Sequence, residues 1–376
     1  MDAKHQCEPT ISRDEAIALD GVDVNDHDLM NRAAAVRDQH WGRRVTYSPK
    51  VFIPLTTYCR DTCGYCTFVQ APHKPSARYL QPDEVLGIAE AGARVGCMEA
   101  LFSLGEKPEL RHPEAQADLA ALGYEHTIDY LRDMCEEVVT KTGLLPHANP
   151  GTMTIDELQQ LKPVTGSMGI MVENVSRRLL QKGMPHHACP DKVPVQRLRT
   201  LERAGEVGVP FTTGILIGIG EKWEERIDSL HAIQSIHERY GHIQEVIVQN
   251  FRAKPGIAMA NHPEPSHAEM LRTLAVARLI LSPQISLQAP PNLADEMTDY
   301  IYAGINDWGG VSPVTQDHIN PERAWPSIGR LRQATAAAGC DLHPRLTLYP
   351  RFLQDPNRFI SPEMREVIAE ARTRLK

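Results

Sequence analysis

The sequence lacks any apolar run long enough to cross a membrane. No stretch of 18 or more apolar residues occurs among its 376 residues, so neither a membrane-spanning helix nor a membrane partner is predicted. The first six residues, Met1 to Gln6, are polar and lack the apolar core of a secretory leader. We therefore expect a cytoplasmic protein, in which thiols stay reduced.

An excess of basic charge is also missing. Lysine and arginine number 40 against 48 aspartates and glutamates, which gives a net charge of −8 and an isoelectric point near 6.1. This balance lacks the positive footprint of a nucleic-acid-binding protein, so no nucleic-acid partner is predicted. The apolar fraction of 42% and the charged fraction of 23% are close to globular averages and exclude a disordered or fibrous chain.

Short apolar runs alternate with amphipathic stretches along most of the chain. Eight runs read as strands: Val51–Leu55, Cys97–Leu101, Leu144–His147, Ser167–Val172, Pro210–Ile217, Glu245–Phe251, Gln284–Leu287 and Gly304–Trp308. Helical periodicity marks Ile128–Val139 and Trp223–Tyr240. The alternation predicts an α/β fold, a (β/α)8 barrel of the TIM type. Because the last two units are weak, an open (β/α)6 partial barrel is the alternative. Pro54 is predicted to mark a strand end or a bulge.

The regions outside the barrel are short. Residues 1–46 are polar and partly helical in pattern, from Asp14 to Leu19 and from Leu29 to Val36, and are interpreted as an N-terminal extension. Residues 47–350 form the predicted barrel, and residues 351–376 form a C-terminal tail that we expect to be helical. In such a barrel the functional site lies at the carboxyl ends of the strands, where the strand-to-helix loops meet.

Three of the eight cysteines lie in one short loop after the first predicted strand. Cys59, Cys63 and Cys66 follow the spacing C-x3-C-x2-C, and three soft thiolates suit an iron–sulfur cluster or zinc. Structural zinc usually takes four protein ligands, for which His73 is the available fourth. A zinc-stabilised, non-catalytic barrel is therefore the alternative from a different class. A 4Fe–4S cluster held by three thiolates leaves one iron open to another ligand.

The triplet in this position resembles the radical S-adenosylmethionine (SAM) superfamily. The resemblance implies that Cys59, Cys63 and Cys66 hold a 4Fe–4S cluster whose open iron binds SAM. One electron from a reducing donor then cleaves SAM to a 5′-deoxyadenosyl radical. In that family an aromatic residue before the third cysteine lies against the adenine, and Tyr65 occupies this place. Arg60 and Asp61 are interpreted as charges that solvate the loop.

The same resemblance implies contacts with SAM after the second and fourth strands. Ser103 and Glu106 match the element that binds the ammonium group, for which carboxylate and carbonyl oxygens are suitable acceptors. Glu173 matches an acidic residue near the ribose or amine; a charge at a helix N-terminus is an equal alternative.

Two later segments extend the implied cofactor site. Arg197 matches an arginine that pairs with the SAM carboxylate, the alternative being a solvated helix face shared with Arg199 and Arg203. Gly218 and Gly220 resemble a glycine-rich strand that lies close to the adenine. A dinucleotide fingerprint is not complete there, because its third glycine is absent.

Sequence runs in the later loops indicate which family of the superfamily the chain resembles. Five segments closely resemble the first-subunit family of 7,8-didemethyl-8-hydroxy-5-deazariboflavin synthases: residues 54–56, 145–151, 243–255, 289–293 and 304–315. The resemblance extends over residues 51–326. The resemblance implies a lyase of deazaflavin coenzyme biosynthesis. Its substrate would be an adduct of tyrosine and a ribityl-aminouracil, supplied by a second radical SAM subunit. Hydrogen abstraction from the 4-hydroxybenzyl methylene, closure onto the uracil and loss of ammonia would follow.

Such a substrate needs neutral amides, hydroxyls and an aromatic wall. The candidate contacts are polar or aromatic residues expected at strand carboxyl ends: Asn149, Gln249, Asn250, Asn292, Asn306, Asp307 and Trp308. Structural amides are the alternative for Asn149 and Asn292. The phenol and the departing amine require a general acid or base, for which Asp307 and His147 are the candidates.

Biotin synthases share much of this pattern and supply the alternative function, another biotin-synthase-like radical SAM enzyme. That family places cysteines on later strands to hold a second cluster, whereas Thr212 and Thr213 precede the fifth-strand glycine run here. Cys97 and Cys135 are interpreted as core residues, so a second cluster is not predicted. No partner is evident for two further cysteines, Cys189 and Cys340.

Overall fold

A closed ring of parallel strands forms the centre of the molecule. The computed structural model describes residues 10–24 and 28–375, so Cys7 and the polar stretch Met1 to Gln6 lie outside the described residues. The ring strands are β1 (Arg44–Thr56), β2 (Glu99–Leu104), β3 (Leu145–Asn149), β4 (Ser167–Gly169), β5 (Phe211–Ile217), β6 (Ile243–Asn250), β7 (Ser286–Gln288) and β8 (Asp307–Val311). Because β1 pairs with both β2 and β8, the sheet closes. The predicted (β/α)8 barrel is confirmed, and the open six-unit form is excluded.

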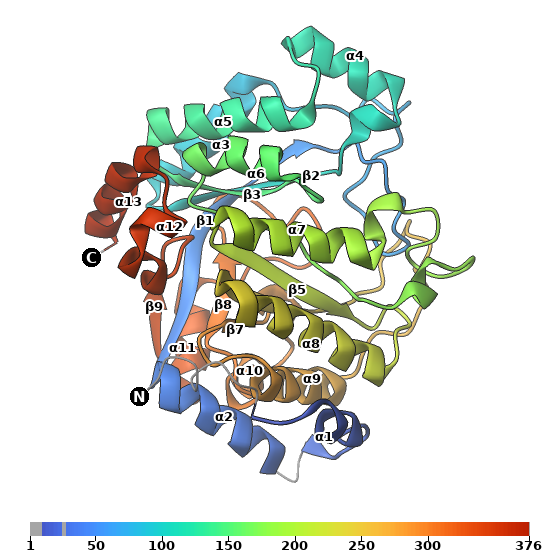
Figure 1. Cartoon of the computed structure of the whole chain (residues 1–376), viewed down its shortest axis with the longest axis vertical. Coiled ribbons are helices and arrows are strands. Elements are labelled where there is room, and N and C mark those ends of the chain that lie inside the picture. Colours follow the sequence, from blue (N-terminus) through green and yellow to red (C-terminus); the bar gives the residue numbers. More distant parts are fainter. Residues whose placement is uncertain (1–9, 25–27, 376) are drawn as a thin grey trace.

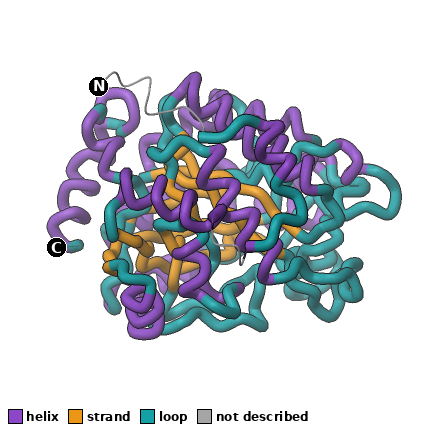
Figure 2. The backbone as a smooth tube through the Cα atoms, turned by 90° about the horizontal axis from the view of Figure 1, so that it is seen from below, coloured by secondary structure: helices purple, strands orange, loops and turns teal. Residues whose placement is uncertain are grey.

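Helices enclose the ring, and the long loops gather at its carboxyl end, to the right in Figures 1 and 2. The helices are α1 (Arg13–Ala18), α2 (Asp28–Trp41), α3 (Pro82–Arg94), α4 (Pro113–Leu122), α5 (Thr127–Thr142), α6 (Ile155–Leu161), α7 (Pro194–Val207), α8 (Trp223–Tyr240), α9 (His267–Ile280), α10 (Met297–Tyr302), α11 (Ile328–Ala337), α12 (Pro356–Phe359) and α13 (Pro362–Arg374). Within the described residues, no helix combines the length and apolarity needed to cross a bilayer.

The central strands are buried on both faces. Every residue of β5, from Phe211 to Ile217, is buried, as expected for a parallel strand covered by helices outside and by side chains inside. The pairing of β1 with β2 shifts register between Pro54 and Thr56, which confirms the predicted bulge. The first part of β1 also pairs with an added strand, β9 (Asp341–Pro344).

The last ring strand starts later than the sequence suggests. The predicted run Gly304–Trp308 is displaced, because β8 begins at Asp307 and continues through Gly309 and Gly310, where a loop is expected from sequence. Gly304 instead ends the turn after α10, its amide donating to the carbonyl of Ile301. The prediction that Asn306, Asp307 and Trp308 lie at a strand carboxyl end is therefore wrong, because they lie at the amino end of β8.

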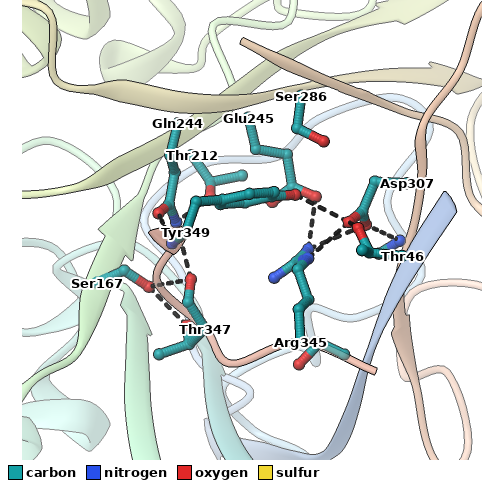
Figure 3. A network of polar contacts seen from close by, with 12 residues as sticks. Thr46, Ser167, Thr212, Gln244, Glu245, Ser286, Asp307, Arg345, Thr347 and Tyr349 are labelled. Atoms are coloured by element: carbon teal, nitrogen blue, oxygen red, sulfur yellow. Dashed lines mark hydrogen bonds and ion pairs between the residues drawn. The ribbon is translucent and has the colours of Figure 1, made fainter. Parts of the chain in front are cut away.

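A polar segment closes the amino end of the barrel. Residues 345–349, which follow β9 and are called the plug below, cross this end (Figure 3). Arg345 donates to both carboxylate oxygens of Asp307, at 2.6 and 3.0 Å, and to Glu245 at 2.8 Å. The Tyr349 hydroxyl donates to Asp307 at 2.9 Å. All four side chains are buried, so the barrel floor is a hydrogen-bonded ionic network.

The C-terminal helices cover the plug. Leu346, Leu348 and Tyr349 share an apolar cluster with Met364 and Ile368 of α13, and Figure 1 shows α12 and α13 at the end of the molecule opposite the long loops. The predicted division at residues 46 and 350 stays a prediction.

Candidate active site

A cavity of about 290 Å³, the outer cavity, opens at the carboxyl ends of the strands. Its walls come from the loops after β1 to β4 and from the ends of β5 and β6. Eleven of the residues proposed from sequence line it: Cys59, Cys63, Tyr65, Cys66, Ser103, Glu106, Asn149, Glu173, Arg197, Gln249 and Asn250. The fold therefore gathers side chains that are up to 191 positions apart in the sequence.

The cysteine loop presents half-buried cysteines to this cavity. The Cys59 sulfur accepts hydrogen bonds from the backbone amides of Glu106 at 3.2 Å and Asp61 at 3.4 Å. Burial raises the pKa of Cys59 to about 12, so its thiolate form needs a nearby positive charge such as a metal supplies. Amide donors and half-buried cysteines that line a cavity fit a sulfur-bound iron cluster.

A close group of potential metal ligands lies beside the cysteine triplet. Among the described residues, the group of three potential ligands within 4.8 Å of one another is Asp61, Glu106 and Asp191, not the cysteine triplet. Tetrahedral zinc with Zn–S bonds of ~2.3 Å requires sulfurs ~3.8 Å apart. Cys59, Cys63 and Cys66 do not form such a close group.

Opposite charges alternate along the wall next to the triplet. Glu106 accepts from the Thr152 amide at 2.6 Å and from Arg197 at 3.3 Å. Arg197 also donates to the carbonyls of Met171 at 2.6 Å and Asp191 at 3.1 Å, and is 4% exposed. The alternative of a solvated helix face is therefore wrong for Arg197.

Arg60 and Asp61 are not the solvating charges expected from sequence. Arg60 forms a bidentate ion pair with the fully buried Asp191. Asp61 is 2% exposed, and its Oδ2 finds no hydrogen-bond partner among the described residues. A buried carboxylate oxygen left unpaired is costly, so Asp61 offers an open acceptor beside the triplet.

Glu173 is held in a strained backbone conformation. Its φ of +65° lies in the left-handed region, which is uncommon for a residue with a side chain. Burial alone would raise the pKa of Glu173, but Lys192 and Arg197 outweigh it and lower the pKa to about 2. Lys192 donates to Glu173 at 2.6 Å. The carboxylate thus stays ionised in the cavity wall.

Two glycines make room for this wall. A Cβ at Gly105 would overlap the carbonyl of Tyr58 and come within 2.7 Å of the Cys59 Cβ. Gly151, at φ +89°, leaves space that a Cβ would take from the Glu106 carboxyl group. Glycine at both places therefore lets the β2 and β3 loops approach the cysteine loop.

Tyr65 and Cys189 come together with residues remote in sequence. The Tyr65 hydroxyl lies 3.1 Å from His186 Nε2. Cys189, for which the sequence suggests no partner, has its sulfur 3.8 Å from that of Cys63. Neither His186, Cys189 nor Lys192 stands in a sequence motif, and only the fold brings the 186–192 loop to the triplet. Cys97 precedes β2, at the opposite end of the barrel.

A second, deeper cavity of about 150 Å³, the inner cavity, lies below the first. It shares Asn149 and Gln249 with the outer cavity and adds His147 and Asn292 from the sequence-based set. The His147 ring nitrogens lie 2.7 Å from Ser167 Oγ and 3.1 Å from Asn149 Oδ1. Burial lowers the pKa of His147 to about 4, so the imidazole is neutral at pH 7.

Five residues proposed from sequence do not line either cavity. Asp307 belongs to the plug network, and Asn306 accepts from Arg278 at 2.6 Å and from the Leu287 amide at 2.9 Å. Trp308 is fully buried and donates to Thr335. The amide of Gly218 donates to Glu221 at 2.8 Å, and the carbonyl of Gly220 accepts from Arg178 at 2.7 Å. The contacts of Asn306, Asp307 and Trp308 hold these side chains away from both cavities, which corrects their predicted roles, whereas the roles of Gly218 and Gly220 stay predictions.

Known proteins are similar to this chain in sequence and in fold. The radical SAM superfamily model matches residues 53–233. An FO synthase of Mycobacterium tuberculosis is 50% identical over 374 residues, covering 95% of this chain but 44% of that protein. The chain thus spans less than half the length of this relative.

A shorter relative is matched along nearly its whole length. The 7,8-didemethyl-8-hydroxy-5-deazariboflavin synthase of Methanopyrus kandleri is 52% identical over 311 residues, which cover 82% of this chain and 93% of that protein.

Solved structures share the fold at low sequence identity. The FeFe-hydrogenase maturase HydG from Carboxydothermus hydrogenoformans superimposes with a TM-score of 0.73 at 18% identity, covering 99% of this chain and 87% of that one. For methylornithine synthase (PylB) the TM-score is 0.69 at 18% identity, with coverages of 88% and 94%.

Proposed function

Because the chain belongs to the 7,8-didemethyl-8-hydroxy-5-deazariboflavin synthase family of the radical SAM superfamily, we propose that it catalyses the ring-closing step of deazaflavin formation. The substrate is an adduct of tyrosine and a ribityl-aminouracil. Hydrogen abstraction from its 4-hydroxybenzyl methylene, oxidative closure onto the uracil and loss of ammonia yield the deazaflavin, which makes the enzyme a lyase.

The observation that carries this proposal is the match to the Methanopyrus kandleri enzyme, 52% identical over 93% of its length. The low-identity structural relatives support the fold alone, since one fold hosts many chemistries.

The outer cavity supplies the binding groups for the proposed cofactors. Cys59, Cys63 and Cys66 would hold a 4Fe–4S cluster, which supplies the electron that cleaves SAM. Glu106 and the open oxygen of Asp61 are acceptors for an ammonium group, and Arg197 supplies a cation for a carboxylate. The cavity is lined by charged side chains of both signs, which suits a ligand that carries an ammonium and a carboxylate group. They are Asp61, Glu106 and Glu173, with Lys192, Arg197, Arg252 and Lys254.

Acid–base assistance cannot come from Asp307, whose carboxylate is saturated in the plug. His147 lines the inner cavity, and its neutral imidazole is already bonded at both nitrogens. We assign it to orienting Asn149 rather than to proton transfer.

Anaerobic reconstitution tests the proposal. With dithionite, SAM and the adduct, the protein should bind about four irons per chain, form 5′-deoxyadenosine and release a fluorescent deazaflavin. The matched control omits the adduct and should give 5′-deoxyadenosine without fluorescence. Cofactor cleavage without deazaflavin would reject the substrate and favour another biotin-synthase-like radical SAM reaction. One tightly bound zinc and no iron would reject the whole class.

A second protein is part of the proposal. A chain with one cysteine triplet would depend on a second radical SAM subunit to supply the adduct and on an external reductant. Tyrosine and the ribityl-aminouracil alone should therefore give no deazaflavin with this protein, and adding the second subunit should restore it. Product from this protein alone would show that it carries both steps.

A further inference from the structure

The inner cavity has the chemistry of a binding site that the cofactor does not use. It extends from the outer cavity toward the plug, and both cavities are lined by Asn149, Thr212, Ile247, Gln249, Ile319 and Asn320. A ligand could therefore occupy both, with one end near the cysteine triplet and the other inside the barrel.

The charges of this cavity are already neutralised. Lys50 donates to Glu99 at 2.6 Å, and both are buried. Arg345 pairs with Glu245 at 2.8 Å and with Asp307. No cation among its described lining residues is left to hold a phosphate or carboxylate, so an anionic ligand is disfavoured. An apolar ligand would remove these polar groups from water without offering them hydrogen bonds, which costs free energy, so an apolar ligand is disfavoured as well.

Two buried polar atoms here lack partners among the described residues. Asn292 is 7% exposed, and its amide nitrogen donates to Asp317 at 2.8 Å, which fixes its orientation and leaves Oδ1 unpaired. The indole nitrogen of Trp325 is likewise buried and unpaired. The Trp325 ring stacks on Phe52 at 5.0 Å, with 9° between the planes. One unpaired acceptor and one unpaired donor therefore belong to residues that line this cavity.

We propose that the inner cavity is the subsite for a neutral polyhydroxylated chain, recognised by the open Asn292 and Trp325 atoms and by the Lys50–Glu99 pair. A hydroxyl group both donates and accepts, so it can satisfy both orphan atoms without adding charge. Resting on the proposed function, this chain is the ribityl group, and the aromatic part of the substrate lies in the outer cavity.

Binding without turnover tests the proposal. The probes are the deazaflavin product, its analogue with a methyl group in place of the ribityl chain, and its 5′-phosphate ester, titrated by fluorescence into reconstituted protein. The product should bind at least about tenfold more tightly than the methyl analogue, because each buried hydrogen bond contributes ~0.5–1.5 kcal/mol. The phosphate ester should bind less tightly than the product.

Conservative variants locate the effect. Trp325→Phe keeps an aromatic ring and Asn292→Leu keeps the side-chain size, and each should reduce the preference for the ribityl group about threefold to tenfold. Lys50→Met combined with Glu99→Gln removes both charges together, which avoids leaving one buried and unpaired. The matched control is Trp308→Phe, which removes an indole donor outside both cavities and should leave the preference unchanged.

The outcomes separate this inference from the proposed function. Equal binding of product and methyl analogue, or tighter binding of the phosphate ester, overturns the polyol subsite even if the protein makes deazaflavin. A ribityl preference that depends on Trp325 and Asn292 in a protein that makes no deazaflavin keeps the subsite and rejects the reaction. Binding of neither ligand rejects both.

Discussion

The two ends of the barrel each bury a cluster of acidic and basic side chains, but only one cluster is complete. In the plug, both oxygens of Asp307 are bonded to Arg345, and Tyr349 adds a further donor. At the carboxyl end, Asp61 keeps an unpaired oxygen and Glu173 adopts a positive φ. The same residue types therefore serve structure where they are satisfied and are available to a ligand where they are not.

Whether a buried charge has all its hydrogen-bond partners indicates its role better than its residue type or its proximity to a strand end does. Asp307 is the better acid–base candidate by sequence, because it lies in a run shared with the family, yet it is fully committed to holding the barrel floor. Asp61 resembles a loop charge in the sequence, yet it is the open acceptor. Substitutions that act differently at the two ends can test the distinction.

The largest effect is expected at the carboxyl end, from Cys63→Ser. Removing one of three thiolates should abolish iron binding and 5′-deoxyadenosine formation, because a hydroxyl is a poor ligand for iron in a sulfur cluster. The barrel should remain folded, as measured by circular dichroism. Cys340→Ser, remote from the cavity, is the control and should retain full activity. Loss of soluble protein with Cys63→Ser would instead indicate a structural metal.

At the amino end, Arg345→Met should act on stability. It leaves Asp307 and Glu245 buried without their shared cation, a defect that costs about 3–5 kcal/mol. Urea unfolding should show this loss, whereas SAM affinity in the surviving folded protein should be near that of the parent. A variant as stable as the parent would show that the plug network is dispensable for stability. The proposed difference between the two ends of the barrel would then be wrong.

The plug should also make stability depend on pH through Glu245. Burial raises the pKa of Glu245 to about 7; Asp307 and Glu99 add to this, and Arg345 and Lys50 oppose it. The pKa of Glu245 in the folded protein exceeds its ordinary value. The contribution of Glu245 to the unfolding free energy is therefore fully present below about pH 4.5 and is lost as the pH rises through about 7.

Between pH 5.5 and 8 the unfolding free energy should fall by on the order of 2 kcal/mol from this group. Urea titrations of the parent and of Glu245→Gln at both pH values measure it, and the variant should show the smaller fall. Identical pH slopes would mean that Glu245 does not titrate in this range.

The smallest effect is expected from Gly151→Ala. The added methyl group would meet the Glu106 carboxyl group, and φ +89° is unfavourable for alanine. SAM affinity, measured by calorimetry, should fall about tenfold, a cost of ~1.4 kcal/mol. Gly123→Ala, also at positive φ but with open space around it, controls for backbone strain. Equal losses in the two variants would assign the effect to strain alone.

Local patterns predicted the barrel and the cysteine loop well. Trp223–Tyr240 is a helix with the predicted bounds, and Pro54 lies at the predicted bulge, because periodicity and proline geometry act over a few residues. The position of the cysteine triplet after β1 follows from the same short-range information.

Residues that meet through the fold alone could not be found in this way. Lys192 lines the cavity and Cys189 contacts Cys63, both from a loop more than 120 positions beyond the triplet. The register of β8 was missed because Gly309 and Gly310 resemble a turn, although a barrel interior tolerates strand glycines where a partner side chain fills the space. Here Gln288 and Lys50 occupy it.

The plug also has a consequence for the order in which the molecule is made. Glu245 and Asp307 leave the ribosome before Arg345, and at ~5–20 residues per second the delay is ~5–20 s for Glu245 and ~2–8 s for Asp307. During that interval the nascent barrel lacks the cation that pairs with both acidic groups. Closure of the floor is therefore coupled to synthesis of residues 345–349, and the strands assembled earlier become fully stable only after this segment has been made.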